Sequence, residues 1–178
     1  MKKLMIGVTG FAVIALGAFW YTSYQDKETA STVVSGDIKQ IVQDFSLGKS
    51  SAKSASITSS ELKVVSQDSK ATVYDLPKDE FFVSIAPFVN ETHPCAIHNL
   101  ATCRGEMANE DFKVYIEDGD GKVVLDQTMK SQPNGFIDLW IPRDQNLKVK
   151  ITHDGKTAES EISTFEDDNT CITTMQLI

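Results

Sequence analysis

The sequence lacks the short motifs that mark the common nucleotide-binding, hydrolytic and disulfide-exchange sites. It contains no glycine-rich phosphate loop, no Gly-x-Ser-x-Gly elbow and no Cys-x-x-Cys pair. Basic residues are also in the minority, with 17 lysines and arginines against 25 aspartates and glutamates and a net charge of -8. This charge balance disfavours nucleic acids and anionic membrane surfaces as partners. The sequence therefore gives no support to hydrolysis, nucleotide binding or nucleic-acid binding.

Charge is missing from the stretch 4–21, which directly follows Lys2 and Lys3. This stretch has about the minimum length for a membrane span. It contains no cysteine, which excludes a lipoprotein start, and no clean cleavage site, and its aromatic run 19–21 suits a membrane interface. We therefore favour an uncleaved membrane anchor over a cleaved signal peptide for residues 1–24. Both alternatives place the rest of the chain outside the cytoplasm. An uncleaved segment anchors it to the outer face of the cytoplasmic membrane, and a cleaved one releases it as a periplasmic or secreted protein.

The segment after this anchor changes from polar to periodic. Residues 25–36 have little apolar content and are expected to form a flexible stalk. Apolar residues then recur at helical spacing over 38–45, between Asp37 as the N-cap and Gly48 as the stop. An isolated helix this short is marginal, so we expect its apolar face to pack against its own domain or against a second copy in a homodimer.

Beyond a polar linker at 49–56, the apolar period becomes two, which is typical of strands. A hairpin predicted over 62–74 completes a small helix-plus-hairpin module at 37–78. A continuous apolar run at 81–89 predicts a buried strand. Further strands are predicted at 112–117, 122–127, 136–141, 147–152, 158–165 and 171–177. The fold class is therefore mainly β, with an antiparallel sandwich of about seven strands over 79–178.

Cysteine is rare, and its placement is informative. Of the three cysteines, Cys95 and Cys103 lie within a segment that also holds His93 and His98, and Cys171 lies near the C-terminus. Thiols and imidazoles are soft ligands for a transition metal, and the predicted strand order allows all three thiols to meet at one end of the sandwich. Three cysteines suit Cu(I), which favours two or three thiolates. Zinc, which prefers four tetrahedral ligands, is an alternative if one histidine joins them.

A structural disulfide is the simpler interpretation of the same cysteines. In an exported chain, a bond from Cys171 to Cys95 or Cys103 would hold the last strand to the long loop. From spacing alone, this disulfide with one spare thiol is favoured over a metal site, and the protein would then be an interaction module at the membrane surface. The two interpretations are compatible if the disulfide is the oxidised form of a three-thiol site.

The three histidines differ in their prospects as ligands. His98 lies on the cysteine segment and is equally well interpreted as a metal ligand or as a hydrogen-bonded structural histidine. His93 precedes Pro94, which restricts the backbone there, so it ranks lower as a ligand. His153 lies next to a predicted hairpin turn and is expected at the surface.

Longer motifs connect this chain with a known family. The segment 76–106 contains Phe82-Val83-Ser84-Ile85-Ala86-Pro87, Thr92-His93-x-Cys95, His98-x-Leu100 and Thr102-Cys103-x-Gly105-Glu106. Nearer the C-terminus are Asn134-Gly135-Phe136, Leu139-Trp140-x-Pro142-Arg143-Asp144 and Thr170-Cys171-Ile172-Thr173-Thr174. These stretches closely resemble the CueP family of periplasmic copper-resistance proteins, and all three cysteines fall on the family pattern.

The resemblance implies a copper-binding protein of the cell envelope that handles Cu(I) through Cys95, Cys103 and Cys171. It also implies a contribution to copper tolerance, delivery of copper to envelope cuproenzymes, and dimerisation through the N-terminal part. The chain departs from the family pattern before residue 49, where it has the apparent anchor and the short module.

Thiolates can also reduce Cu(II) while forming a disulfide. One such reaction consumes the thiols, so continued reduction requires an external thiol-disulfide reductase as a partner. No dedicated active site is needed for this step. We therefore expect a binding protein rather than an enzyme.

Overall fold

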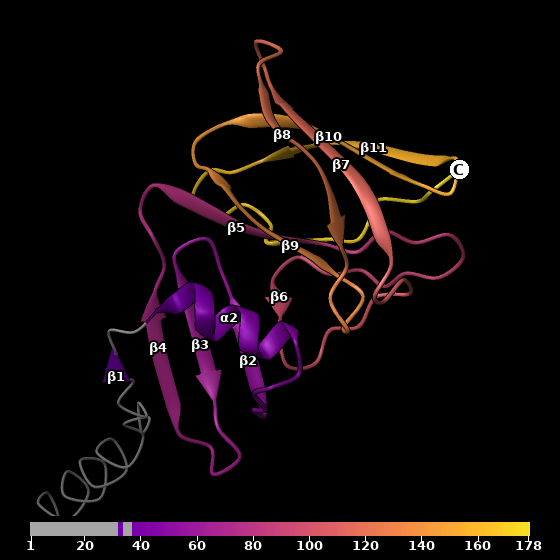
Figure 1. The fold of residues 1–178 in the computed structure, drawn as a ribbon. Helices are drawn as coiled ribbons and strands as arrows, with labels where there is room; N and C mark the ends of the chain where they lie inside the picture. The colour runs from indigo at the N-terminus through magenta and orange to yellow at the C-terminus, as the bar shows by residue number, and fades with distance from the viewer. Residues whose placement is uncertain (1–31, 34–36) are drawn as a thin grey trace, which may run out of the picture. The chain divides into compact units, whose positions relative to one another are not determined.

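The computed structural model describes residues 32–33 and 37–178, which form a mainly β structure with one α-helix in this part of the chain (Figure 1). The fold class predicted from the sequence is confirmed at this level. No helix among the described residues is long and apolar enough to cross a membrane. The anchor predicted for residues 1–24 lies outside the described residues, as does most of the predicted stalk.

The helix α2 spans Ile38–Ser46, as predicted. The side chain of Asp37 accepts a hydrogen bond from the Gln40 backbone N–H at 3.3 Å, which caps the first turn. Gly48, just beyond the helix, has a φ of 70°, a left-handed conformation that suits glycine at a helix end. The buried side chains of Val42 and Phe45 pack on the neighbouring sheet, so the apolar face of α2 is covered by its own chain.

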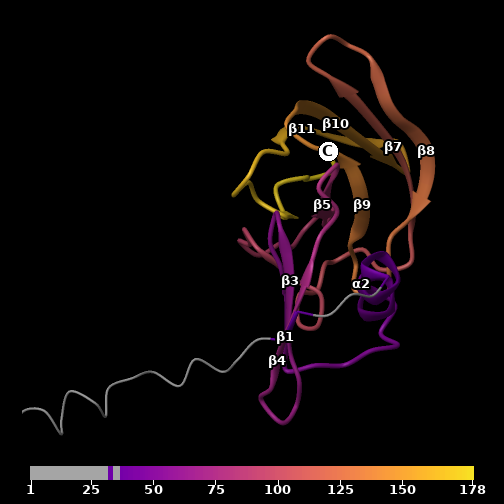
Figure 2. The same cartoon turned by 90° about the vertical axis from the view of Figure 1, so that its left-hand side faces the viewer.

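That neighbouring sheet has five strands in the order β1-β4-β3-β2-β6. Figure 2 shows α2 on one side of it. The strands are β1 (Thr32–Val33), β2 (Ser54–Ile57), β3 (Glu61–Val65), β4 (Ala71–Asp75) and β6 (His98–Asn99). The antiparallel pair β3 and β4 is the predicted hairpin.

Two strands of this sheet lie in segments predicted to be irregular. β2 begins inside the predicted linker 49–56, because Ala55 and Ile57 alternate with polar neighbours and are fully buried beneath α2. β1 lies inside the predicted stalk and pairs in parallel with β4. The described residues cluster as one compact unit, and a domain boundary near residue 78 stays a prediction.

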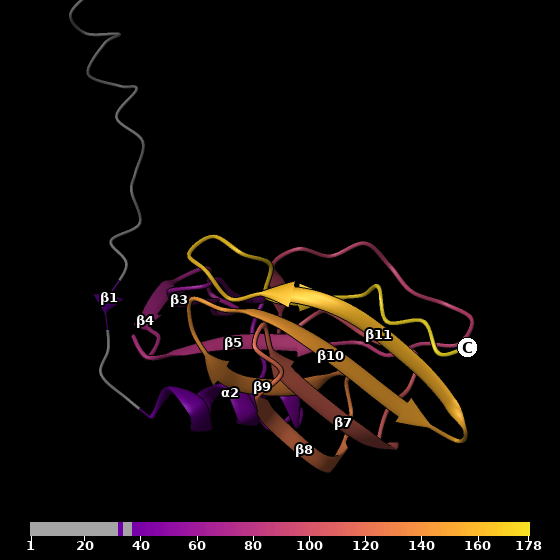
Figure 3. The same ribbon diagram turned by 90° about the horizontal axis from the view of Figure 1, so that it is seen from above.

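The remaining strands form two further sheets, which face each other across a shared apolar core (Figure 3). One has the order β11-β10-β7-β8 and the other the order β12-β5-β9. Both contribute buried aliphatic and aromatic side chains to the core, for example Ile151 and Val83. Their strands are β5 (Glu80–Ile85), β7 (Asp111–Asp118), β8 (Val123–Lys130), β9 (Ile137–Pro142), β10 (Asn146–His153), β11 (Lys156–Ser163) and β12 (Cys171–Ile172).

The C-terminal strand differs from its prediction in length and direction. β12 contains only Cys171–Ile172 and runs parallel to β5, with Cys171 opposite Ser84, whereas an antiparallel strand over 171–177 was expected. The chain leaves the ladder after Ile172 but still buries Met175 and Leu177 in the shared core. Burial of these two side chains explains the apolar pattern that was interpreted as a longer strand.

Candidate metal centre

The three cysteines meet where the long connection between β5 and β7 passes the start of β12. The backbone N–H groups of Thr170 and Cys171 both donate to the Ala96 carbonyl, at 3.0 and 3.1 Å. These bonds join the C-terminal strand to the loop that carries Cys95. The Thr170 hydroxyl donates to the Ile57 carbonyl at 2.6 Å and accepts from the His98 N–H at 3.1 Å. Thr170 therefore holds three distant segments together next to the thiols.

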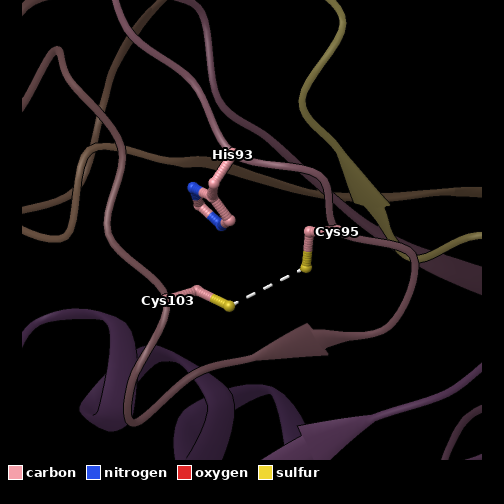
Figure 4. Close-up of side chains that lie close together, drawn as sticks. All are labelled: His93, Cys95 and Cys103. Carbon is pink, nitrogen blue, oxygen red and sulfur yellow. Dashed lines mark hydrogen bonds between the residues drawn. The ribbon is translucent and has the colours of Figure 1, made fainter.

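Cys95 and Cys103 face each other across this loop, with their Sγ atoms 3.8 Å apart (Figure 4). Cys103 ends a tight turn, in which its backbone N–H donates to the Asn99 carbonyl at 2.9 Å. In return, its sulfur accepts from the Asn99 N–H at 3.4 Å. The Cys95 thiol lies 3.4 Å from the Ile97 carbonyl. All three cysteines are free thiols in this structure.

His98 is fully buried, and its Nδ1 lies 3.6 Å from the Sγ of Cys171. Its ring packs on Phe136, with ring centroids 4.4 Å apart. The other ring nitrogen, Nε2, is buried without a hydrogen-bond partner, a condition that costs about 1–3 kcal/mol. Packing and the backbone bond to Thr170 therefore hold the imidazole beside the thiols of Cys171 and Cys103.

The donor atoms form two compact groups that share Cys103. One group is His93, Cys95 and Cys103, all half-buried; the other is His98, Cys103 and Cys171, of which the first and last are buried. Within each group all donor atoms lie within 4.8 Å of one another. The structure thus brings together all four side chains singled out from the sequence.

His93 was ranked below these four because proline follows it, yet its imidazole joins Cys95 and Cys103 in the half-buried group (Figure 4). The His-x-Cys spacing was the available sequence signal for this placement. His153, in contrast, lies at the end of β10, where Nδ1 is 2.8 Å from the Asp111 carbonyl and the ring packs on Phe112. Its side chain is only 14% exposed, so the expected surface position was wrong.

The pKa values of the three thiols differ because their surroundings differ. The hydrogen bond from the Cys171 thiol is the largest cause that lowers the pKa of Cys103 to about 3, and the contacts with His98 and the Asn99 N–H act in the same direction. The bond to Cys103, followed by burial, raises the pKa of Cys171. Burial is also the main cause that raises the pKa of Cys95. Cys103 is therefore the thiolate of the group at neutral pH and the readiest metal ligand or nucleophile.

Apolar contacts surround the sulfurs, and two cavities reach the group. Cys171 packs with buried Phe136 and Ala86, and the other two cysteines pack against this cluster. A cavity of about 310 Å³ is lined by Cys95 and Cys171, together with Asp167 and Asp168. A second cavity, of about 320 Å³, is lined by His93, Glu91, Thr92 and Arg104, among others.

The loop after Cys103 is fixed by two closely packed glycines. The Gly105 N–H donates to the Asn134 carbonyl at 2.7 Å. A Cβ on Gly105 would lie 2.5 Å from the Gly135 carbonyl oxygen, and a Cβ on Gly135 would clash with the Gly105 carbonyl oxygen. Gly135 also has a φ of 85°. Only glycine therefore allows the Cys103 loop and the turn before β9 to approach so closely.

Glu106 fixes the same loop through hydrogen bonds to the segment that follows β5. Its carboxylate accepts hydrogen bonds from the backbone N–H groups of Val89 and Asn90, at 2.6 and 3.0 Å, and from the Asn90 side chain at 2.8 Å. The Asn90 backbone N–H is the largest cause that lowers the pKa of Glu106 to about 2. The segment leading from β5 toward His93 is thereby tied to the loop that carries Cys103.

Comparison with known proteins agrees with the resemblance seen in the motifs. The family model described as "Periplasmic copper-binding protein CueP" matches residues 37–176. The crystal structure of S.CueP is 35% identical in sequence, with a TM-score of 0.74, and the alignment covers 92% of this chain and 98% of that chain. No protein in the curated set matches significantly. Because the family model spans most of the chain, including all three cysteines, this protein belongs to the CueP family.

Proposed function

We propose that this protein binds copper in the periplasm, and that it captures Cu(I) through the thiolates of Cys95, Cys103 and Cys171. The observation that carries this proposal is the convergence of three free thiols from two distant parts of the chain. Membership of a family described as periplasmic and copper-binding supports both the metal and the compartment. His98 is proposed as an additional ligand, since its Nδ1 faces Cys171.

The donor set favours Cu(I) over zinc. Three soft sulfur donors in an apolar environment match the two or three thiolates that Cu(I) prefers. Zinc needs four ligands in a tetrahedron, so it would have to recruit one histidine as well as all three thiols. His98 and His93 lie in different donor groups, and each is near Cys103. A zinc-bound form of the protein is therefore the alternative, and comparing the affinities for Cu(I) and Zn(II) tests it.

Reduction of Cu(II) is a second part of the proposal. Two thiolates each supply one electron, so two Cu(II) ions become two Cu(I) ions as one disulfide bond forms. The Sγ atoms of Cys95 and Cys103 are 3.8 Å apart and so need only a small movement to bond. An external thiol-disulfide reductase would restore the thiols. In this account the protein contributes to copper tolerance and delivers Cu(I) to envelope cuproenzymes.

The test is an anaerobic titration of the reduced full chain with Cu(I) against a competing chelator, repeated with Zn(II). We expect one tightly bound Cu(I), and an affinity at least about 100-fold lower in Cys103→Ser. Thr174→Val, an exposed change next to β12, is the control. Weak Cu(I) binding that is equal in all three proteins would contradict the proposal and favour the disulfide-held interaction module.

A further inference from the structure

Cys103 belongs to both donor groups, and the two groups differ in exposure. His93, Cys95 and Cys103 are each half-buried, whereas His98 and Cys171 are 0% and 2% exposed. A metal ion held by Cys103 therefore has one set of partners toward solvent and another toward the core. We call the first set the outer group and the second set the inner group.

Within the outer group, His93 lines a cavity that Cys171 does not line. His93 lines the cavity of about 320 Å³, whose wall also includes Glu91 and Arg104. The buried ring of Phe136 lies near both histidines, with its centroid 6.4 Å from that of His93 and 4.4 Å from that of His98. Pro94 restricts the backbone between His93 and Cys95, which keeps these two donors on the same side of the loop.

We propose that copper occupies two overlapping positions, and that His93, Cys95 and Cys103 form an outer position at which the ion is exchanged with donors and acceptors outside the protein. This inference rests on the proposed function and adds His93 as a ligand for exchange. The ion then moves inward while Cys95 and Cys103 remain attached.

The inward step is a ligand replacement without a change in oxidation state. The bond from Cu(I) to the His93 imidazole breaks, and a bond to the Cys171 sulfur forms. The Cys171 thiol proton leaves to solvent through the cavity of about 310 Å³ that this residue lines. Thiolate is the softer ligand, so replacing imidazole by thiolate retains Cu(I) more tightly in the core, and the reverse step returns it to the surface.

Exchange kinetics test this inference. In His93→Gln we expect Cu(I) transfer from and to a small-molecule chelator to be at least about tenfold slower than in the unaltered chain. His153→Gln, a histidine change on β10, is the control and should leave the rates unchanged. An unchanged rate in His93→Gln would overturn the inference and indicate loading from the Cys171 side.

A second variant shows where the ion rests. Cys171→Ser should trap Ag(I), used as a redox-inert analogue of Cu(I), in the outer group. The imidazole nitrogen resonances of His93 should then shift on metal addition, while those of His98 stay in place. A shift confined to His98 would overturn the inference. Failure of the unaltered chain to bind Cu(I) would instead contradict the proposed function, so the two failures are distinguishable.

Discussion

The imidazole of His98 and the thiol of Cys171 lie 3.6 Å apart, although 73 residues separate them in the chain. Their proximity depends on the short parallel pairing of β12 with β5 and on the Thr170 hydrogen bonds. The inner group therefore forms only when the C-terminal strand is in place. Docking of this strand and binding of the metal should stabilise each other.

Thr170→Val tests this dependence on the C-terminal strand. The substitution keeps the volume of the buried side chain but leaves the Ile57 carbonyl and the His98 N–H without their partner. We expect the free energy of unfolding of the metal-free protein to fall by about 1–3 kcal/mol, with weaker Cu(I) binding, measured by urea unfolding and chelator competition. The exposed change Thr174→Val should alter neither the free energy of unfolding nor Cu(I) binding. An equal effect of the two substitutions would contradict the role of Thr170.

The contact between the two glycines is tested by a matched pair of alanine substitutions. Gly135→Ala and Gly155→Ala both place a side chain at positive φ, but only the first also meets backbone atoms within 3 Å. We expect Gly155→Ala to destabilise the fold by about 1 kcal/mol, and Gly135→Ala to cost clearly more and to weaken Cu(I) binding by displacing the Cys103 loop. Thermal unfolding measures the difference. Equal losses in the two variants would show that the contact does not position the loop.

Glu106→Gln should loosen the segment before His93. The neutral glutamine amide accepts the N–H groups of Val89 and Asn90 more weakly than the carboxylate does, and its NH2 group cannot accept from the Asn90 side chain. We therefore expect hydrogen exchange of these two N–H groups to be several-fold faster at pH 6. Glu91→Gln, a change at an exposed neighbour, is the control. Mass spectrometry of the peptide that contains Val89 and Asn90 reports the rates.

The pH dependence of this loop follows from the lowered pKa of Glu106. Because the folded pKa is about 2 and the ordinary value is 4.5, the stabilisation is fully present above about pH 4.5 and is lost as the pH falls through 2. The difference in exchange between the unaltered chain and Glu106→Gln should therefore shrink over that range. A difference that is constant from pH 6 to pH 2 would contradict the carboxylate's role.

The rate at which Cys103 is alkylated should depend on pH differently from the rates of the other two thiols. Its lowered pKa of about 3 means that the thiolate is present throughout pH 5–8, so its iodoacetamide reaction rate should be nearly constant over that range. The rate at Cys95, whose pKa is raised by burial, should increase about tenfold per pH unit. Peptide mass spectrometry of the reduced, metal-free protein measures both rates. A tenfold rise per unit at Cys103 would be inconsistent with the hydrogen bonds assigned to its sulfur.

Local signals in the sequence were sufficient for much of the fold. Asp37 and Gly48 delimit α2 because capping and chain reversal depend on the residues themselves. β2 was missed because its small side chains carry little apolar signal, and only burial under α2 reveals the alternation of Ala55 and Ile57. The parallel direction of β12 depends on pairing with a strand far away in sequence, which no local pattern encodes.

The candidate site, like the fold, was predictable from the sequence mainly where its residues lie close together in the chain. The spacing of Cys95, His98 and Cys103 identified a local cluster, and the predicted strand order, supported by the family motifs, added Cys171. The place of His93 was underestimated because the adjacent proline suggested a role in shaping the loop. Proline instead fixes the backbone next to Cys95, and the imidazole lies beside two thiols. The partition into an outer and an inner group arises from burial, which requires the folded chain.

The most direct test of the central claim is X-ray absorption spectroscopy of the full chain loaded with one equivalent of Cu(I) under anaerobic conditions. We expect three sulfur neighbours around copper in the unaltered chain, and two sulfur neighbours with one nitrogen in Cys171→Ser. A copper ion with the same single sulfur neighbour in both proteins would contradict a site built from Cys95, Cys103 and Cys171.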